Sequence, residues 1–485
     1  MILEEILKIL KKKSENKAYT INMKSYTYAD LYKYVCNIYH YLLKENTEKR
    51  PVIVYGHKQI YMKASFLACS FAGMAYVPLD DTMPAERKEM IINQVKPKVI
   101  ITPEIEYIMN QENYKEIEDI YLNPNDIYYM IFTSGSTGIP KGVKVTYKNI
   151  DSCIRWLRKI TNVKKGVILN QANFSFDLSV ADLYLSLISE SEHFILEDNT
   201  ITNFKEIFKE LKCSKATLAV MTPSFMDLLL LDKSFNQDMM PKLEKIIFCG
   251  ERLKTTTVKK IYERFENLDV INCYGPTEAT FAVTSMKLPR NLKNIEEIPC
   301  GKVKDDVNIH IVNEHKEILN DGQVGEILIV GESVADGYLG NVKNNPFINY
   351  EGKKAYLTGD IGSIKENILY YKCRKDNQIK YKGYRIEFSD IESNLEKIDY
   401  IEKSKVIAIR NKDGSITNLL AFVKLKEDMH KSEFEIRKDL LKKLPKYMCP
   451  NITLVDKFPI NKNGKCDEKK MMEDYLYERK DYRNS

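Results

Sequence analysis

The chain lacks the features that mark secreted, membrane and metal-stabilised proteins. None of its ten cysteines forms a C-x-x-C pair or stands near a histidine at metal-ligand spacing, so neither a zinc site nor a disulfide framework is predicted. The longest uncharged stretch, residues 64–79, contains Ser, Gly and Pro and is too short for a membrane span. The first five residues include two glutamates where a signal peptide has basic residues. We therefore expect a cytoplasmic protein with free thiols and no membrane insertion.

A strong charge of either sign is also absent. Lys plus Arg total 74 and Asp plus Glu total 68, so the net charge is only +6 over 485 residues. Because no basic stripe with interleaved aromatic residues stands out, nucleic acid is not an expected partner. The small positive excess suits an acidic protein partner. Internal repeats and low-complexity linkers are missing too, and a hydrophobic content of 44% is ample for more than one packed domain.

Helix and strand patterns alternate along most of the chain, which predicts an α/β fold with much parallel sheet. Helical apolar spacing occurs in residues 2–11, 29–43 and 61–71. Short apolar runs that predict strands occupy residues 52–55, 76–79, 99–102, 167–170, 216–221, 245–248 and 270–272. Alternating strands in residues 325–372 predict a small β-rich subdomain. A compact α+β segment follows, with helices predicted at 388–398 and 433–444 and strands at 405–409 and 419–423.

A loop rich in glycine and hydroxyl groups follows the apolar residues 131–132. It contains Thr133, Ser134, Gly135, Ser136, Thr137, Gly138 and Lys141. Glycine lets backbone N–H groups approach phosphate oxygens, Ser and Thr add donors, and lysine adds positive charge. The spacing matches neither Walker A nor G-x-G-x-x-G. The loop predicts phosphate binding, and taken alone it is also compatible with a flexible surface turn.

This loop resembles the signature of the adenylate-forming superfamily, which includes acyl-CoA synthetases, luciferases and nonribosomal-peptide adenylation domains. Further segments resemble the other family motifs, in the family's order, at residues 26–31, 73–80, 272–278, 356–360, 373–387, 444–450 and 463–467. The resemblance implies ATP and Mg²⁺ as cofactors. It also implies a large N-terminal domain of layered sheets and helices with a β-rich subdomain, residues 1–375, and a small mobile α+β domain, residues 376–485. Asp376 matches the family's hinge residue.

The resemblance assigns roles to the segment that contains Asn272, Tyr274 and Gly275. Tyr274 offers a π face to adenine, and Thr277 donates to the α-phosphate. Glu278 ligates Mg²⁺, a hard cation that prefers carboxylate and phosphate oxygens. Taken alone, the same segment is compatible with a tight turn.

The later motifs carry the ribose site, the carrier passage and a catalytic lysine. Asp360 would accept hydrogen bonds from both ribose hydroxyls, with Arg374 assisting. The family usually has glycine where Cys373 stands. Gly383 matches the position where the pantetheine arm passes close to the backbone. Lys465 matches the mobile catalytic lysine, although its segment alone is also a good β-turn.

The implied chemistry has two steps. A carboxylate attacks the α-phosphorus of ATP, and the repulsion between the two anions is neutralised by Mg²⁺ at Glu278, by the loop, by Thr277 and by Lys465. The thiol of a phosphopantetheinylated carrier protein then attacks the acyl-adenylate. Because Lys465 and the pantetheine arm need the same approach, the family rotates the C-terminal domain between the two steps.

The acid is predicted to be a small amino acid. Asp177 matches the residue of amino-acid-activating members that pairs with the α-ammonium, although it is equally suited to be a helix N-cap. The family's specificity positions map onto Leu178, Ala181, Met221, Ile247, Cys249, Cys273, Phe281 and Ala282. They are apolar and partly bulky, which favours an alanine-like side chain. A closer resemblance over residues 169–283 is to members that activate D-alanine for teichoic acid D-alanylation, and the D configuration rests on that resemblance alone.

Three alternatives remain open at this point. The nearest is an adenylation enzyme for another small amino acid in a peptide or natural-product pathway. In either case we expect a monomer. The second is an acyl-CoA synthetase, which Asp177 disfavours. The third is a non-catalytic nucleotide-binding protein, which the joint presence of Glu278, Asp360 and Lys465 disfavours.

Overall fold

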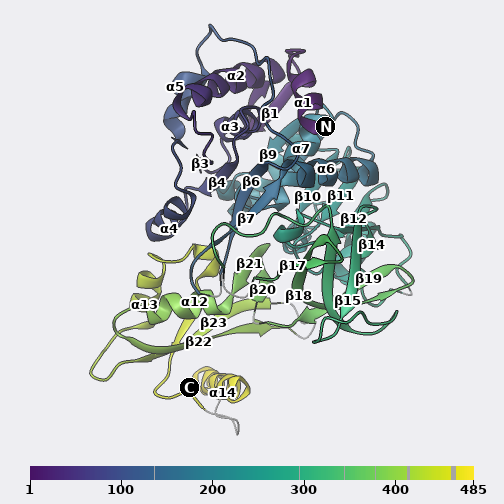
Figure 1. Cartoon of the computed structure of the whole chain (residues 1–485). Coiled ribbons are helices and arrows are strands. Elements are labelled where there is room, and N and C mark those ends of the chain that lie inside the picture. The colour runs from purple at the N-terminus through teal and green to yellow at the C-terminus, as the bar shows by residue number, and fades with distance from the viewer. Residues whose placement is uncertain are drawn as a thin grey trace.

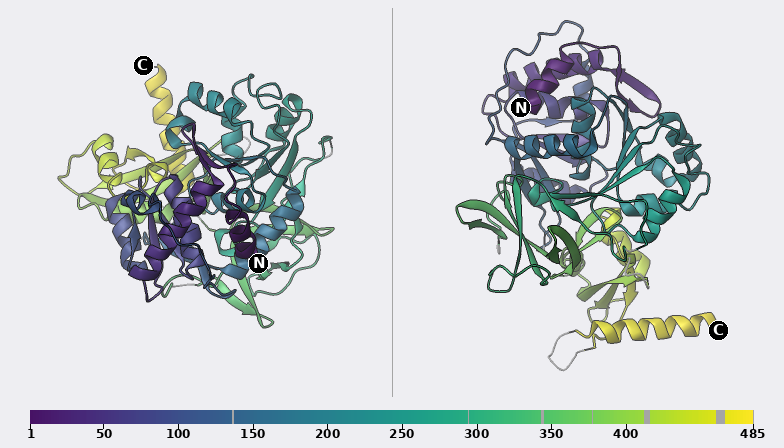
Figure 2. Two further views of the ribbon diagram at one scale, coloured as in Figure 1. Left: turned by 90° about the horizontal axis from the view of Figure 1, so that it is seen from above. Right: turned by 90° about the vertical axis from the view of Figure 1, so that its right-hand side faces the viewer.

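The structure is a computed structural model of the whole chain, and it describes residues 1–135, 137–293, 295–342, 345–376, 378–411, 416–459 and 466–484 (Figure 1). We call the residues up to 375 the N-terminal part and the rest the C-terminal part. In Figure 1 the N-terminal part forms the upper body and the right-hand side, and the C-terminal part lies at the lower left. Helix α14 (Glu468–Asn484) projects on the side away from the N-terminus (Figure 2). Among the described residues, no helix combines the length and apolar character needed to cross a bilayer.

The first sheet of the N-terminal part has the strand order β5-β3-β4-β6-β7. Its strands are β3 (Val52–Gly56), β4 (Tyr76–Asp80), β5 (Ile100–Ile101), β6 (Ile127–Thr133) and β7 (Lys141–Thr146). The first four run parallel, whereas β6 and β7 are antiparallel and pair Thr133 with Lys141. The glycine-rich loop therefore connects two hydrogen-bonded strands, so both of its ends are fixed.

The second sheet has fourteen strands within the described residues. In spatial order these are β15 (Val307–Val312), β16 (Gly325–Gly331), β18 (Lys353–Lys365), β19 (Ile368–Arg374), β14 (Gly301–Val303), β13 (Thr284–Lys287), β12 (Asp269–Tyr274), β11 (Lys245–Phe248), β10 (Leu218–Met221), β8 (Val167–Asn170), β9 (Glu192–Ile195), β1 (Lys17–Ile21) and β2 (Lys24–Thr27). Strand β17 (Phe347–Tyr350) pairs with β18. The strands β12, β11, β10, β8 and β9 pair in parallel, as the alternation with helices predicts. From β12 through β13 to β15, all pairs are antiparallel. The β-rich region thus begins at β13, earlier than predicted, and continues the same sheet.

Helices cover both sheets and meet between them. They are α1 (Ile2–Leu10), α2 (Tyr28–Glu45), α3 (Ile60–Phe71), α4 (Ala85–Val95), α5 (Glu106–Met109), α6 (Tyr147–Thr161), α7 (Leu178–Ile188), α8 (Asp198–Thr202), α9 (Phe204–Ser214), α10 (Pro223–Leu229) and α11 (Thr255–Arg264), with short 3₁₀ turns at Pro103–Ile105 and Thr277–Ala279. Every residue of α7 is buried, and most of them are apolar, as expected for a helix inside a core. The helix is a central core element.

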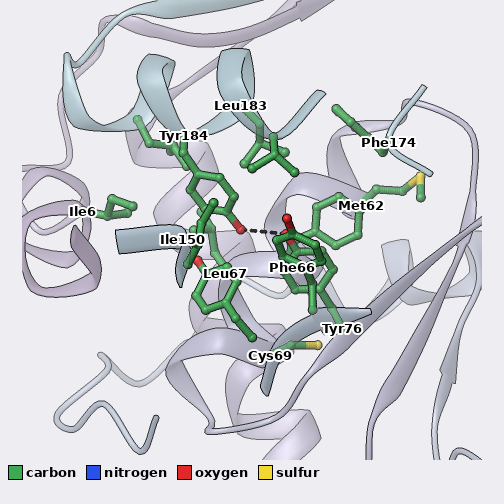
Figure 3. Close-up of a cluster of buried hydrophobic side chains, with 14 of the residues drawn as sticks. Ile6, Met62, Phe66, Leu67, Cys69, Tyr76, Ile150, Phe174, Leu183 and Tyr184 are labelled. Atoms are coloured by element: carbon green, nitrogen blue, oxygen red, sulfur yellow. Dashed lines mark hydrogen bonds between the residues drawn. The ribbon is translucent and has the colours of Figure 1, made fainter. Parts of the chain in front are cut away.

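Figure 3 shows how α7 is fixed in this core. Leu183 and Tyr184 of α7 face Met62 and Phe66 of α3, and the Tyr184 hydroxyl hydrogen-bonds that of Tyr76 on β4 at 2.9 Å. Buried hydroxyls that partner each other avoid the cost of an unsatisfied polar group. Because the body of α7 cannot shift without disrupting these contacts, the position of its N-terminal end is also fixed.

The C-terminal part builds its own sheets and its own core. A two-stranded hairpin, β20 (Gln378–Tyr381) and β21 (Tyr384–Glu387), precedes a sheet of β22 (Ile401–Arg410), β23 (Ile416–Leu425) and β24 (Asn451–Leu454). Helices α12 (Phe388–Glu396) and α13 (Glu433–Leu440) pack on this sheet, and a 3₁₀ turn follows at Lys446–Met448. Their apolar residues form a separate buried cluster that includes Ile386, Ile391 and Leu440. The predicted α+β segment is confirmed in type, although both predicted helices end earlier than expected.

Candidate active site

Two connected hollows lie where the C-terminal part meets the carboxyl ends of the parallel strands β10, β11 and β12, the usual place for a ligand in an open α/β sheet. The larger hollow has a volume of about 1460 Å³. The smaller one, of about 80 Å³, is lined by Thr133, Ser134, Asp177, Gly275, Thr277, Asp360 and Arg374 from the N-terminal part. Lys380, Gly383 and Arg385 of the β20–β21 hairpin complete its wall. Seven predicted site residues from five separate segments therefore converge.

The glycine-rich loop is covered by the C-terminal part. The Ser134 hydroxyl donates to the backbone carbonyl of Arg385 at 3.0 Å, and Lys141 Nζ lies 3.6 Å from the Glu387 carboxylate. A Cβ atom at Gly135 would come within 2.1 Å of the Ile139 carbonyl oxygen, so the tight loop requires glycine there. Ser136, also predicted to bind phosphate, lies outside the described residues. Thr133 and Ser134 of the loop line the small hollow.

The predicted nucleotide residues Tyr274, Asp360 and Arg374 form one hydrogen-bonded group. The Tyr274 hydroxyl donates to Asp360 Oδ2 at 2.6 Å, and Arg374 Nη1 donates to Asp360 Oδ1 at 2.8 Å. Asp360 is only 2% exposed, so this pairing provides the countercharge that a buried carboxylate needs. Lys380 Nζ lies over the Tyr274 ring, 5.6 Å from its centre.

Asn272 and Gly275 lie at the carboxyl end of β12, where the first makes a hydrogen bond and the second allows a close backbone approach. Asn272 Nδ2 donates to the Pro299 carbonyl at 2.8 Å, which leaves its buried Oδ1 without a partner among the described residues. A Cβ atom at Gly275 would come within 2.5 Å of Ala282 Cα. Glycine is therefore what allows the end of β12 to approach the next segment so closely.

Glu278, the predicted metal ligand, is completely buried. Its Oε2 accepts a hydrogen bond from Arg385 Nη1 at 2.6 Å, and its Oε1 accepts one from the Tyr338 hydroxyl at 2.7 Å. Burial acts to raise the pKa of Glu278, but the charge of Arg385 and these hydrogen bonds outweigh it and hold the pKa below its ordinary value. The carboxylate is therefore ionised and neutralised by a cation from the C-terminal part.

Asp376, the predicted hinge residue, is held by a two-point ion pair. Arg374 Nε donates to Asp376 Oδ1 at 2.9 Å, and Arg374 Nη2 donates to Asp376 Oδ2 at 2.7 Å. Burial opposes ionisation of Asp376, yet the contacts with Arg374 lower its pKa overall. Arg374 thus bridges Asp360 in the nucleotide group and the start of the C-terminal part.

Asp177 stands directly before α7 without capping it. Its side chain makes no capping hydrogen bond, so the carboxylate remains available to the small hollow that it borders. Burial raises the pKa of Asp177, while a hydrogen bond from Thr277 and the charge of Lys380 oppose the rise. The rigid seat of α7 in the core fixes where this carboxylate points.

The predicted specificity residues divide into two groups. Cys249, Cys273 and Phe281 belong to the same buried cluster, and Cys249 Sγ lies 3.8 Å from the Phe281 carbonyl oxygen. Burial raises the pKa of Cys249 to about 12, so its thiol is neutral and acts as a small apolar surface. Met221 instead packs in the other large cluster with Phe225 and Phe248, because alternate residues of a strand face opposite sides. The structure therefore does not bring Met221 to the other three.

The turn that carries Phe281 has an unusual backbone. Thr280 and Phe281 both have positive φ, 58° and 70°, which is rare for a bulky residue. The Thr280 hydroxyl stabilises the turn by donating to the Ser333 carbonyl at 2.9 Å. Strained backbone of this kind concentrates at functional sites. No sequence pattern indicated it, since neither residue type predicts a left-handed conformation.

Several further contacts at the site were not predicted, because each joins residues more than 100 positions apart. Gly383 N donates to Glu251 Oε1 at 2.6 Å, and Phe176 packs edge-on against the Tyr384 ring at 4.5 Å between centroids. Arg87 of α4 pairs with Asp390 of α12 at 3.0 Å, and both side chains are at least nine-tenths buried. The first two contacts hold the β20–β21 hairpin in the hollow, and the ion pair joins α12 to the N-terminal part.

Lys465, the predicted catalytic lysine, lies outside the described residues. The described neighbour Cys466 packs beside Met471 on the face of the β22–β23 sheet that also carries Phe422. That face is the one covered by α14, below the sheet in Figure 1 and away from the hairpin.

The comparisons with known proteins agree with this geometry. Residues 8–339 match the family model described as AMP-binding enzyme. The chain belongs to the AMP-binding enzyme family. Among its curated relatives, the D-alanine–D-alanyl carrier protein ligase of Listeria monocytogenes serovar 1/2a is 39% identical over 89% of this chain and 90% of its own length. The ligase of the same name from Bacillus anthracis is 35% identical over 97% of this chain and 99% of its own.

A solved structure shares the fold across nearly the whole chain. The adenylation domain AlmE from Vibrio cholerae, in complex with glycyl-adenosine-5′-phosphate, superposes with a TM-score of 0.85 and covers 98% of both chains at 20% identity. At that identity the likeness concerns the fold alone. The predicted fold class and the resemblance to adenylate-forming enzymes are both confirmed.

Proposed function

We propose that this protein is an ATP-dependent ligase that activates D-alanine as an aminoacyl-adenylate and transfers it to the phosphopantetheine thiol of a carrier protein. The observation that carries the amino-acid specificity is the position of the Asp177 carboxylate. It makes no capping hydrogen bond to α7, and it borders the small hollow beside the phosphate loop. The choice of D-alanine is supported by the names of relatives that align over nearly the whole chain. Teichoic acid D-alanylation is the pathway that follows from this choice, and ATP supply favours the cytoplasm.

The residues present fit ATP and Mg²⁺. Asp360 and Arg374 line the small hollow together with the loop hydroxyls of Thr133 and Ser134, and Tyr274, which is hydrogen-bonded to Asp360, lines the larger hollow. A single buried carboxylate, Glu278, suits Mg²⁺, which uses one or two carboxylates together with substrate phosphates and water. When bound, the ion neutralises charge that develops on the phosphate oxygens. Thr277 and Lys141 would add donors on the same side.

The second half of the reaction is supported by the placement of the hairpin. Gly383 lies at the junction of the two hollows with its N–H held by Glu251, and it borders Thr222 at the end of β10. The larger hollow is lined by residues of both parts, Gly383 among them. We propose that it admits the pantetheine arm, and that this orientation of the C-terminal part is the one used for transfer. We also propose Asp376 as the hinge and residues 375–376 as the domain boundary, since the strands on either side pair in separate sheets.

The first test is amino-acid-dependent ATP–pyrophosphate exchange, measured for D-alanine, L-alanine, glycine and the other common L-amino acids. We expect the highest kcat/KM for D-alanine. A maximum for another small amino acid would assign the enzyme to a different pathway while retaining the ATP site. Equal rates for the two alanine enantiomers would remove the D-alanine proposal.

Tyr274→Phe tests the nucleotide group with a modest expected effect. The variant keeps the ring and deletes one hydrogen bond to Asp360, which Arg374 still neutralises. We expect weaker ATP binding by about 0.5–1.5 kcal/mol, measured as an increase in KM for ATP with kcat retained. Tyr371→Phe, which removes the hydroxyl of a β19 ring whose centroid lies 6.5 Å from that of Tyr274, serves as the control. An unchanged KM for ATP in Tyr274→Phe would mean that the Tyr274–Asp360 hydrogen bond does not contribute to nucleotide binding.

A further inference from the structure

The turn that carries Phe281 is a γ-turn. Ala282 N donates to the Thr280 carbonyl at 2.9 Å, and Phe281 between them has a φ of 70°. A γ-turn whose central residue has a positive φ is rare and strained. Thr280 also has a left-handed backbone, and its hydroxyl donates to the Ser333 carbonyl at 2.9 Å. Two consecutive residues in unfavourable conformations persist only where the surrounding structure fixes them.

Lys304 is a buried cation behind this turn, with a side chain that is 3% exposed. Its ammonium donates to the hydroxyls of Ser152 and Ser333, the latter at 3.0 Å, and lies 3.0 Å from Asp306 Oδ1. An ammonium has three protons, and these partners use all three. The backbone N–H of Lys304 donates to the Val283 carbonyl at 2.9 Å, directly after the turn.

The contacts of Lys304 connect it to Phe281 through the loop that contains Ser333. Lys304 fixes the Ser333 hydroxyl, and the Ser333 carbonyl accepts the Thr280 hydroxyl. Asn149 of α6 holds the same loop, because its Nδ2 donates to the carbonyls on either side of Ser333 at 2.7 and 3.3 Å. A buried ion pair is weak evidence for stability, since removing charges from water offsets their attraction. A role in holding the strained turn accounts for a lysine at this buried position.

We propose that Lys304 is a positioning residue for amino-acid selectivity, which it controls by holding the Thr280–Phe281 turn in place. The inference rests on the proposed function, in which Phe281 limits the size of the substrate side chain. Lys304 lines neither hollow, so it acts through the turn. The turn is joined to the small hollow at Thr277, whose carbonyl accepts a hydrogen bond from Thr280 N at 3.1 Å. Its Phe281 carbonyl also lies 3.8 Å from the Cys249 thiol.

Loss of this support should make the pocket less selective for size. A left-handed backbone that is no longer held relaxes toward negative φ, and this change moves both the ring and the carbonyl of Phe281. An apolar pocket of fixed size discriminates against one extra methylene by ~10-fold to ~200-fold. That discrimination requires a wall that does not yield, so it should fall when Lys304 or the Thr280 hydroxyl is removed.

The test compares ATP–pyrophosphate exchange with D-alanine and with D-2-aminobutyrate, which is one methylene longer. In Lys304→Met and in Thr280→Val we expect the ratio of kcat/KM for the two acids to fall about tenfold, with little change in the KM for ATP. Thr280→Ser keeps the donating hydroxyl and should retain the ratio. Lys302→Met, the matched control, removes a charge from an exposed position of β14 and should behave like the unmodified enzyme.

The double variant of Lys304→Met and Thr280→Val should lower the ratio no further than either substitution alone, because both act through one set of contacts. An unchanged ratio in either single variant would overturn the inference, even with a lower melting temperature, since a merely structural role predicts lost stability without altered selectivity. If Lys304→Met did not fold, Thr280→Val with its Thr280→Ser control would decide. A preference of the unmodified enzyme for another amino acid would overturn only the D-alanine proposal, and the ratio would then compare that acid with its homologue one methylene longer.

Discussion

Gly383→Ala is expected to stop transfer to the carrier protein while leaving adenylation intact. An added Cβ would come within 2.7 Å of Thr222 Cγ2, and Gly383 has a φ of +84°, which a residue with a side chain rarely adopts. The hairpin would therefore be displaced from the hollow when it seats. A displacement of about 1 Å can cost ~10²-fold in rate, and we expect a loss of that size in carrier loading measured by mass spectrometry.

Gly352→Ala is the matched control for this variant. Gly352 has a similar φ of +78°, but a Cβ there would meet nothing within 4 Å. It carries the same backbone penalty without the clash, and both half-reactions should proceed normally. If Gly383→Ala slowed ATP–pyrophosphate exchange as much as carrier loading, the assignment of this orientation to transfer would be wrong.

Asp177→Asn is expected to cause the largest loss of amino-acid activation. The substitution keeps the shape of the side chain and removes the charge that would pair with the substrate's ammonium group in a largely enclosed hollow. Truncating one partner of such a pair costs about 2–5 kcal/mol, which corresponds to ~30-fold to ~4,000-fold in kcat/KM for the amino acid. The dissociation constant for ATP, measured in the absence of amino acid, should not change.

Asp198→Asn is the control for Asp177→Asn. Asp198 lies on the wall of the larger hollow and does not line the small one. Its replacement by Asn removes one negative charge, as Asp177→Asn does, but at a different place. We expect little change in the KM for the amino acid. If Asp177→Asn retained its activity, the proposed ammonium site would be excluded, and a carboxylic acid without an amino group would become the better candidate substrate.

The fold was largely predictable because its strands and helices follow simple apolar patterns. Strands such as β3 and β8 fell within a residue of their predicted positions. The continuity of β12 with β13 was not predictable, because a change from parallel to antiparallel pairing depends on which strands become neighbours. Nor did periodicity indicate where α13 ends, since the apolar Leu444 extends the pattern beyond Leu440.

The site was predictable where its residues lie in contiguous motifs, as Tyr274 and Asp360 do. The contacts of Lys380 with Tyr274 and of Arg385 with Glu278 were not predictable, because both cations reach the site only through the placement of the β20–β21 hairpin. Met221 shows the complementary difficulty. One residue of strand register decides which side of the sheet a side chain faces, and motif spacing alone does not resolve it.

The buried pair of Arg87 and Asp390 makes the balance between domain orientations sensitive to temperature. The pair joins α4 to α12, so any rotation that separates the two parts returns both charges to water. The hydration of charged groups becomes less favourable on warming, and the cost of keeping them buried falls accordingly. Heating within the stable range should therefore favour the seated hairpin over the separated arrangement. The two half-reactions would then respond differently to temperature, although they share one set of active-site residues.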